Sequence, residues 1–172
     1  MLSVLRALNL RDALDTDLPF LISMWFEAAF WDPATRRPTI EQALAVPELA
    51  IYIDGWGRTG DGAVIATDDE PVGAAWYRLF AAEKPGYGFV DERTPELGIG
   101  VVAHRRREGI GAALLDALCE RATSDGFEQI SLAVSGGNNA IHLYERAGFV
   151  VVSPEGTGWK MVKALRGSSG DA

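Results

Sequence analysis

The chain has 172 residues, of which 48% are hydrophobic and 23% charged, and its formal net charge is −8. This composition is typical of one globular domain, and the acidic charge argues against a nucleic-acid partner because phosphate contacts need a basic face. No apolar run approaches the ~20 residues that span a bilayer, and the amino-terminal stretch does not read as a signal segment. We therefore expect a cytoplasmic protein with no membrane partner.

A single domain is predicted over residues 1–165, followed by a small, polar tail over 166–172 that we expect to be disordered. The first elements in chain order are a short strand near Leu8 and a helix that begins around Asp15 to Asp17, with Pro19 in its first turn. Residues 39–46 predict a second, short helix that ends near Pro47.

Residues 63–80 contain two strand-like runs joined by an acidic turn, which predicts a hairpin. After a long loop, the pattern alternates: a strand over 95–103, a helix over about 109–123, a strand over 129–134, a helix near 139–147, and strands over 149–153 and 158–165. Strands that pair first in hairpins and later alternate with helices indicate an α/β sandwich with a mixed sheet. The single cysteine, Cys119, falls on the second long helix, where we interpret it as a core residue rather than a nucleophile.

The stretch "RRREGIGAALLDAL", residues 105–118, places arginines and two glycines at the start of a helix. A helix amino terminus carries unsatisfied N–H groups and a partial positive charge, so it can bind a phosphate, and Gly109 and Gly111 would let the ligand approach closely. The alternative is that the glycines only make a tight strand-to-helix connection. The stretch lacks both the Gly-Lys-Ser/Thr of a nucleoside-triphosphate loop and the third glycine of a dinucleotide turn.

A second segment, "NNAIHLYERAGFVVV", lies about thirty residues downstream. Together the two segments resemble the GNAT superfamily of acyl-CoA-dependent N-acyltransferases. Residues 106–111 match its loop Arg/Gln-x-x-Gly-x-Gly/Ala, and the second segment matches its Asn-x-Ala…Leu-Tyr-Glu-x-x-Gly-Phe element. The resemblance covers most of the chain except about residues 31–62. It implies a three-layer sandwich with a mixed, mostly antiparallel sheet of six or seven strands and about four helices.

The resemblance also implies acetyl-CoA as co-substrate and no metal. Backbone N–H groups of residues 107–112 would hold the pyrophosphate, residues 101–103 would contact the pantetheine arm, and a donor near Ile99 or Gly100 would polarise the thioester carbonyl. A β-bulge at Gly100 would let the coenzyme approach the backbone of this strand closely. The implied coenzyme-binding residues are Gly100, Val101, Val102, Ala103, Arg106, Arg107, Glu108, Gly109, Ile110, Gly111, Ala112 and Asn138.

Two catalytic residues follow from the same resemblance. Tyr144 matches the family tyrosine near the coenzyme sulfur, which can protonate the departing thiolate; its alternative role is a packed aromatic on the helix. Glu96 begins the strand that carries the coenzyme contacts, where several members place the base, but it could also be a solvated carboxylate. His142 and His104 are alternative bases because an imidazole titrates in the right range, and water is a further alternative.

The acceptor side is less defined. Six aromatics lie in the family-variable half or its loops, some of them expected in the core, and the loop between the third and fourth strands adds carboxylates that could form an amine-binding rim. These residues are Trp31, Trp56, Trp76, Tyr77, Tyr87 and Phe89, with Glu83, Asp91 and Glu92. Ribosomal-protein alanine acetyltransferases carry a glutamate where this chain has Ala133. We therefore expect acetylation of a small primary amine, with a protein or peptide acceptor and a non-catalytic acyl-CoA sensor as alternatives. Dimers are common in the family, and no residue here decides the oligomeric state.

Overall fold

The computed structural model describes residues 7–165, and the polar tail predicted over 166–172 lies outside them. Seven strands form one sheet in the order β1-β2-β3-β4-β5-β7-β6. The strands are β1 (Asn9–Asp12), β2 (Gly62–Asp68), β3 (Glu70–Arg78), β4 (Glu96–Val101), β5 (Gln129–Val134), β6 (Val150–Glu155) and β7 (Gly158–Ala164). All neighbours pair antiparallel except β4 and β5, so the mixed, mostly antiparallel sheet is confirmed.

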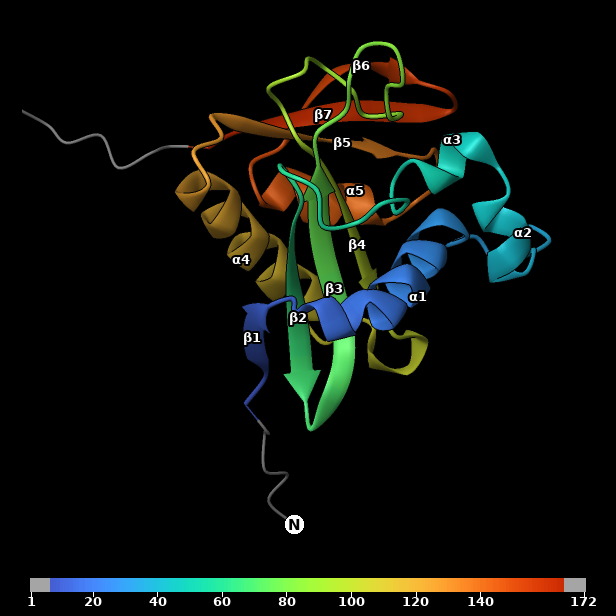
Figure 1. Ribbon diagram of the computed structural model, residues 1–172, viewed down its shortest axis with the longest axis vertical. Coiled ribbons are helices and arrows are strands. Elements are labelled where there is room, and N and C mark those ends of the chain that lie inside the picture. Colours follow the sequence, from blue (N-terminus) through green and yellow to red (C-terminus); the bar gives the residue numbers. More distant parts are fainter. Residues whose placement is uncertain (1–6, 166–172) are drawn as a thin grey trace, which may run out of the picture.

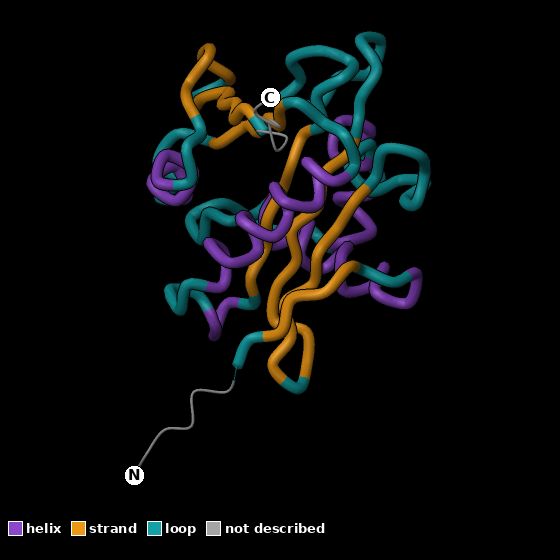
Figure 2. The backbone as a smooth tube through the Cα atoms, turned by 90° about the vertical axis from the view of Figure 1, so that its left-hand side faces the viewer, coloured by secondary structure: helices purple, strands orange, loops and turns teal. Residues whose placement is uncertain are grey.

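Helices cover both faces of this sheet, which gives three layers (Figures 1 and 2). One face is covered by α1 (Leu18–Ala29), α2 (Ile40–Leu44) and the segment after α3 (Pro47–Ala50), with their own core cluster around Leu21, Trp25 and Trp76. On the other face, α4 (Ile110–Ser124) and α5 (Ala140–Arg146) pack in a second cluster. Two short 3-10 helices, η1 (Asp15–Asp17) and η2 (Ala103–Arg105), precede α1 and α4.

The sheet opens between β4 and β5. These strands run parallel, but only Glu96 and Ser131 form a register pair, and beyond that pair the strands separate. The strands β5, β7 and β6 accordingly run across the top of the molecule, in a different direction from β2, β3 and β4 (Figure 1). The separation leaves the backbone of β4 beyond Glu96 without a neighbour on that side among the described strands.

Residue type explains the local geometry of β4. Glu96, Gly98 and Gly100 alternate on the face of α1, while Leu97, Ile99 and Val101 face α4. A Cβ at Gly98 would lie 2.6 Å from the Trp76 ring, and one at Gly100 would lie 2.5 Å from the Met24 carbonyl oxygen. The two glycines therefore allow the indole and helix α1 to pack directly on the strand.

The structure adds one element after the short helix expected over residues 39–46. Pro47 begins α3 rather than only ending the preceding helix, because the fixed backbone of proline suits the first helical turn, where no N–H partner is needed. Helix α2 itself is confirmed, and Thr39 and Gln42 form its capping box. Trp76 is a core residue, as expected for some of the aromatics, because β3 is buried on both faces from Val72 to Arg78.

Candidate active site

The amino terminus of α4 has the features of an anion site. Gly109 caps the helix with φ 82°, no side chain accepts from the first N–H groups, and the first turn contains no acidic residue. Nothing lies within 4 Å of the position where a Cβ of Gly109 would be, so the turn is open on that side. Arg107, with φ 64°, adds a second left-handed residue to the turn. The free N–H groups of this helix can therefore donate hydrogen bonds to a phosphate.

The three arginines of the turn have different environments. Arg105 pairs with Glu108 at 2.7 Å and with Asp68 at 3.1 Å, so its charge is largely compensated. Arg106 donates to the carbonyl of Val101 at 3.2 Å and pairs with Glu27 of α1 at 3.1 Å. Arg106 thus ties the turn to β4 and α1, and Arg107 is exposed at its rim.

The open edge of β4 presents alternate backbone groups. The N–H of Val102 donates to Val72 of β3, and in an antiparallel pair the direction alternates along the strand. The N–H groups of Ile99 and Val101 therefore point into the gap beside β5, whereas that of Gly100 points to β3. The pairing of β3 and β4 shows no register shift, so the bulge expected at Gly100 is absent.

The directions of the β4 backbone N–H groups decide which of the predicted contacts with the pantetheine arm are possible. Val101 and Ile99 have backbone groups on the side of the gap, as a ligand there would require. Both polar backbone groups of Val102 are already used, because its carbonyl accepts from Arg105 at 3.0 Å. The N–H groups of Val102 and Gly100 both point to β3, so neither can donate to a thioester carbonyl or to the coenzyme arm in the gap.

Glu96 is the buried carboxylate of the site. It is 4% exposed at the start of β4, exactly where β4 and β5 begin to separate. Its Oε1 accepts from the Tyr52 hydroxyl at 2.7 Å and from the Gly88 N–H at 2.9 Å. Its Oε2 is buried and has no hydrogen-bond partner within residues 7–165. Burial raises the pKa of Glu96 to about 7, against the lowering effect of these hydrogen bonds and of Lys160.

A glycine-rich loop encloses this carboxylate. A Cβ at Gly86 would lie 2.1 Å from Oε2 of Glu96, and one at Gly88 would lie 2.9 Å from its Cδ and 2.7 Å from the backbone of Leu132. The loop thus passes between the carboxylate and β5 at backbone contact distance. Only glycine allows this approach at both positions.

Tyr144 lies on α5 and is 9% exposed. Its ring packs edge-on against Phe149 at 5.9 Å between centroids, so both the catalytic and the packing interpretations remain compatible with its place. Burial raises the pKa of Tyr144 to about 12, which keeps the phenol protonated near neutral pH.

Asn138 accepts from the N–H of Ala140 at 3.0 Å and so forms the turn that begins α5.

The alternative bases lie outside the enclosed part of the site. His104 is exposed beside the arginine turn. The His142 side chain is 64% exposed and faces Glu145 at 3.6 Å. Neither imidazole contacts Glu96 or the loop around it.

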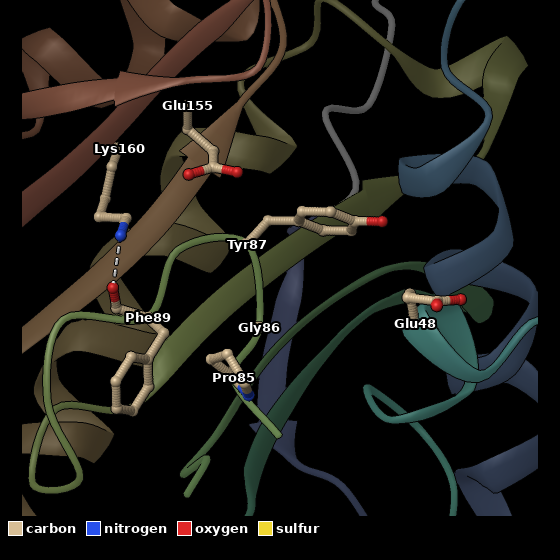
Figure 3. Close-up of a pocket in the computed structure, with 7 residues that line it drawn as sticks. All are labelled: Glu48, Pro85, Gly86, Tyr87, Phe89, Glu155 and Lys160. Atoms are coloured by element: carbon tan, nitrogen blue, oxygen red, sulfur yellow. Dashed lines mark hydrogen bonds between the residues drawn. The ribbon is translucent and has the colours of Figure 1, made fainter. Parts of the chain in front are cut away.

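A pocket of about 360 Å³ adjoins the loop that covers Glu96. Three parts of the chain line it: Glu48 of α3, residues 85–87 and Phe89 of the loop, and Glu155 and Lys160 of the β6–β7 hairpin. The Tyr87 ring extends into the space between Glu155 and Glu48, and Lys160 donates to the carbonyl of Phe89 at 2.6 Å (Figure 3). Two carboxylates, one ammonium group and an aromatic ring thus surround a space large enough for a small molecule.

Of the aromatics predicted near the acceptor, only Tyr87 and Phe89 line this pocket. Trp76 and Tyr77 are core residues, and the Tyr77 hydroxyl donates to Asp125 at the end of α4. Asp91 and Glu92 stabilise the loop itself, because they accept from the N–H groups of Arg93 and Ala82. They are therefore loop-forming residues rather than a free rim.

Sequence reasoning missed Tyr52, Glu48, Glu155 and Lys160. Tyr52 lies in the stretch that matched no family motif, and its hydroxyl donates a hydrogen bond to Glu96, which is 44 residues away in the sequence. The Lys160 ammonium group donates to the carbonyl of Phe89, which is 71 residues away in the sequence. No local pattern signals such pairs, since only the folded sheet brings them together.

The fold is a three-layer α/β sandwich whose central sheet has an open strand edge, and the comparisons identify the family. The family described as "Acetyltransferase (GNAT) family" matches residues 23–149, so the chain belongs to this family and is an acetyltransferase. The resemblance to GNAT proteins is thereby confirmed. None of the helices within residues 7–165 is long and apolar enough to cross a bilayer.

Individual relatives agree with this assignment. The chain is 29% identical over 151 residues to the L-methionine sulfoximine/L-methionine sulfone acetyltransferase of Pseudomonas paraeruginosa, covering 83% of this chain and 80% of the relative. A phosphinothricin acetyltransferase from Sinorhizobium meliloti, solved with AcCoA, superposes with a TM-score of 0.65 at 24% identity, covering 92% of this chain and 88% of that one. The ribosomal-protein-alanine N-acetyltransferase from Brucella melitensis superposes with a TM-score of 0.66 at 24% identity, covering 91% and 99%. These structures share the fold.

Proposed function

We propose that the protein transfers the acetyl group of acetyl-CoA to the primary amine of a small molecule, by direct attack within a ternary complex. The observation that carries the proposal is the alignment of three features: the uncapped start of α4, the open edge of β4, and the buried carboxylate of Glu96 where that edge begins. A phosphate-binding turn, a backbone donor and a base are the groups that acyl transfer from a coenzyme thioester requires.

Each of these residues would have a separate role in binding the coenzyme or in transferring the acetyl group. N–H groups of residues 107–112 would hold the pyrophosphate, and the N–H of Ile99 would polarise the thioester carbonyl. Glu96 would take the proton from the attacking amine, and Tyr144 would donate one to the departing thiolate. Since Cys119 is buried and its burial raises the pKa of the thiol, it offers no nucleophile for a covalent acyl intermediate.

A small acceptor is supported by the pocket. Its volume of about 360 Å³ suits an amino-acid-sized molecule, and the loop and hairpin close it on two sides. The Pseudomonas relative is named for two amino-acid substrates, and the Sinorhizobium protein for phosphinothricin. A peptide acceptor would need a longer groove, and the position of the glutamate found in ribosomal-protein alanine acetyltransferases is occupied by Ala133.

The test measures thiol release from acetyl-CoA with a panel of amines that includes methionine sulfoximine, methionine sulfone, phosphinothricin, simple diamines and a peptide with an amino-terminal alanine. We expect transfer to at least one small amine and little to the peptide. Preferred acetylation of the peptide would contradict the small-acceptor proposal. Tight coenzyme binding with no transfer to any amine would instead support the sensor alternative.

Two further expectations belong to the same proposal. We expect the protein to act in the cytoplasm, where acetyl-CoA is available. A homodimer also stays a prediction; the edge strand β6 exposes Val150, Val151 and Val152, each at 46% or more, which is a surface that a second copy could cover. Sedimentation or light scattering would decide this.

A further inference from the structure

The Tyr52 hydroxyl connects Glu96 to the loop that covers it. It donates to Oε1 of Glu96 at 2.7 Å and accepts from the N–H of Tyr87 at 2.6 Å. A backbone N–H can only donate, so the single phenolic proton of Tyr52 is directed to the carboxylate. The direction of both hydrogen bonds is therefore fixed.

The two oxygens of Glu96 differ as a result. Oε1 accepts two hydrogen bonds, from Tyr52 and from the N–H of Gly88, whereas Oε2 is buried and accepts none from residues 7–165. A proton that arrives at Oε2 leaves both bonds to Oε1 in place. A proton at Oε1 would break at least one of them. The contacts of Tyr52 thus select Oε2 as the oxygen that gains and loses a proton.

The position of Tyr52 is held from two sides. Its ring packs edge-on against Phe80, at 5.1 Å between centroids, and stacks with Tyr87 at 6.3 Å. The buried Arg78 side chain donates to the carbonyls of Ile51 at 2.9 Å and Asp54 at 2.6 Å, so the backbone around Tyr52 is fixed as well. Burial raises the pKa of Tyr52, which keeps its proton in place over the working range of an enzyme.

We propose that Tyr52 is a positioning residue, which presents Oε2 of Glu96 as the proton-accepting oxygen and sets the pH range over which this carboxylate acts. The proposal rests on the proposed function, in which Glu96 is the base. The charged or titratable groups that act on Glu96 are Tyr52 from the segment after α3, Lys160 from β7 and Glu155 from β6. Within the described residues 7–165, only Tyr52 makes a side-chain hydrogen bond to it.

The test compares wild type with Tyr52→Phe, which keeps the ring and its packing but removes the hydroxyl. Loss of a hydrogen bond to the ionised carboxylate makes ionisation harder, so the pKa of Glu96 rises. We expect the acidic limb of the kcat/KM profile to move up by roughly one pH unit, with roughly fivefold lower activity at pH 7 that recovers at pH 9. The affinity for acetyl-CoA should not change.

Tyr77→Phe is the matched control, because Tyr77 also donates to a carboxylate, that of Asp125, but lies outside the site. Its rate profile should keep the wild-type midpoint. A merely structural role of Tyr52 would lower activity by the same factor at every pH, and that result would overturn the proposal.

A direct titration separates this proposal from the proposed function. The carboxyl carbon of Glu96 is followed by NMR in protein labelled with ¹³C-glutamate, and Glu96→Gln identifies its signal. An unshifted titration in Tyr52→Phe would overturn the positioning role, whatever the kinetics show. A shifted titration together with full activity of Glu96→Gln would instead show that Tyr52 controls the carboxylate but that Glu96 is not the base.

Discussion

Glu96 and Ser131 lie opposite each other where β4 and β5 separate, and each carries a buried side-chain oxygen without a hydrogen-bond partner within residues 7–165. An unpaired buried polar group costs about 1–3 kcal/mol, so two neighbouring ones are not expected from packing alone. Both oxygens lie at the point where β4 and β5 separate, beside the gap in which we propose that the acetyl group is transferred.

Replacing Glu96 with glutamine should lower kcat/KM by about 10²–10⁴, because a positioned general base contributes a factor of that size. In wild type, burial raises the pKa of Glu96 to about 7. The base is active when ionised, so the wild-type rate should rise with pH through about 7 and then level off. Glu96→Gln should lose this dependence while binding acetyl-CoA normally in calorimetry. A wild-type pH profile in the variant would contradict the assignment.

The same substitution should change how stability depends on pH. The pKa of Glu96 is raised from 4.5 to about 7 on folding, so between these values the folded state holds more protons than the unfolded state. The free energy of unfolding of the wild type therefore falls as pH rises through this window, by at most about 3 kcal/mol. The variant Glu96→Gln lacks this pH-dependent fall in the free energy of unfolding. In urea unfolding, its stability relative to wild type should be higher at pH 8 than at pH 4.5; an equal difference at both would contradict the prediction.

Tyr144→Phe should lower kcat by roughly 10- to 100-fold if the phenol protonates the thiolate. The ring still packs against Phe149, so stability should change little. Burial raises the pKa of Tyr144 to about 12, and the rate should therefore show no loss from its ionisation below about pH 10. Steady-state kinetics over pH 6–10 tests both statements, with Tyr77→Phe as control. Unchanged turnover would leave Tyr144 as a packing residue.

Gly109→Ala and Gly126→Ala form a matched pair at the two ends of α4. Both glycines have positive φ, 82° and 91°, and neither has an atom within 4 Å of the position of a Cβ. Each substitution should cost about 1–3 kcal/mol of stability through backbone strain. Only Gly109→Ala should also weaken acetyl-CoA binding, roughly tenfold, since it alters the phosphate turn. Equal affinities of the two variants in calorimetry would count against a phosphate site at Gly109.

Arg78→Met should destabilise the fold by about 3–5 kcal/mol, because it leaves Asp61 as an uncompensated buried charge. The two side chains are 1% and 3% exposed and pair at 2.7 Å. Adding Asp61→Leu should restore part of the loss, and denaturant unfolding of the single and double variants measures it. If the double variant is no more stable than Arg78→Met, the cost arises from the carbonyls of Ile51 and Asp54 instead.

Elements with local signals were predictable. Helix α4 begins one residue after the expected position, with the glycine in the left-handed conformation that a β-carbon would disfavour. Strand β5 has the predicted bounds, because its apolar run is bounded by polar turns. The wrong expectation at Gly100 has a tertiary cause: this glycine serves the packing of α1, and the strand pairs without a bulge.

The sequence by itself indicated the family, the glycine turn before α4 and the position of Glu96 at the start of its strand, because each depends on motifs or residue types at short spacing. Only the tertiary structure decided what surrounds Glu96. Tyr52, Gly88 and Lys160 reach the site from three separate segments, and the pKa of a carboxylate depends on burial and partners that are set by the folded sheet and its loop. The same glutamate on an exposed strand end would be an ordinary surface acid.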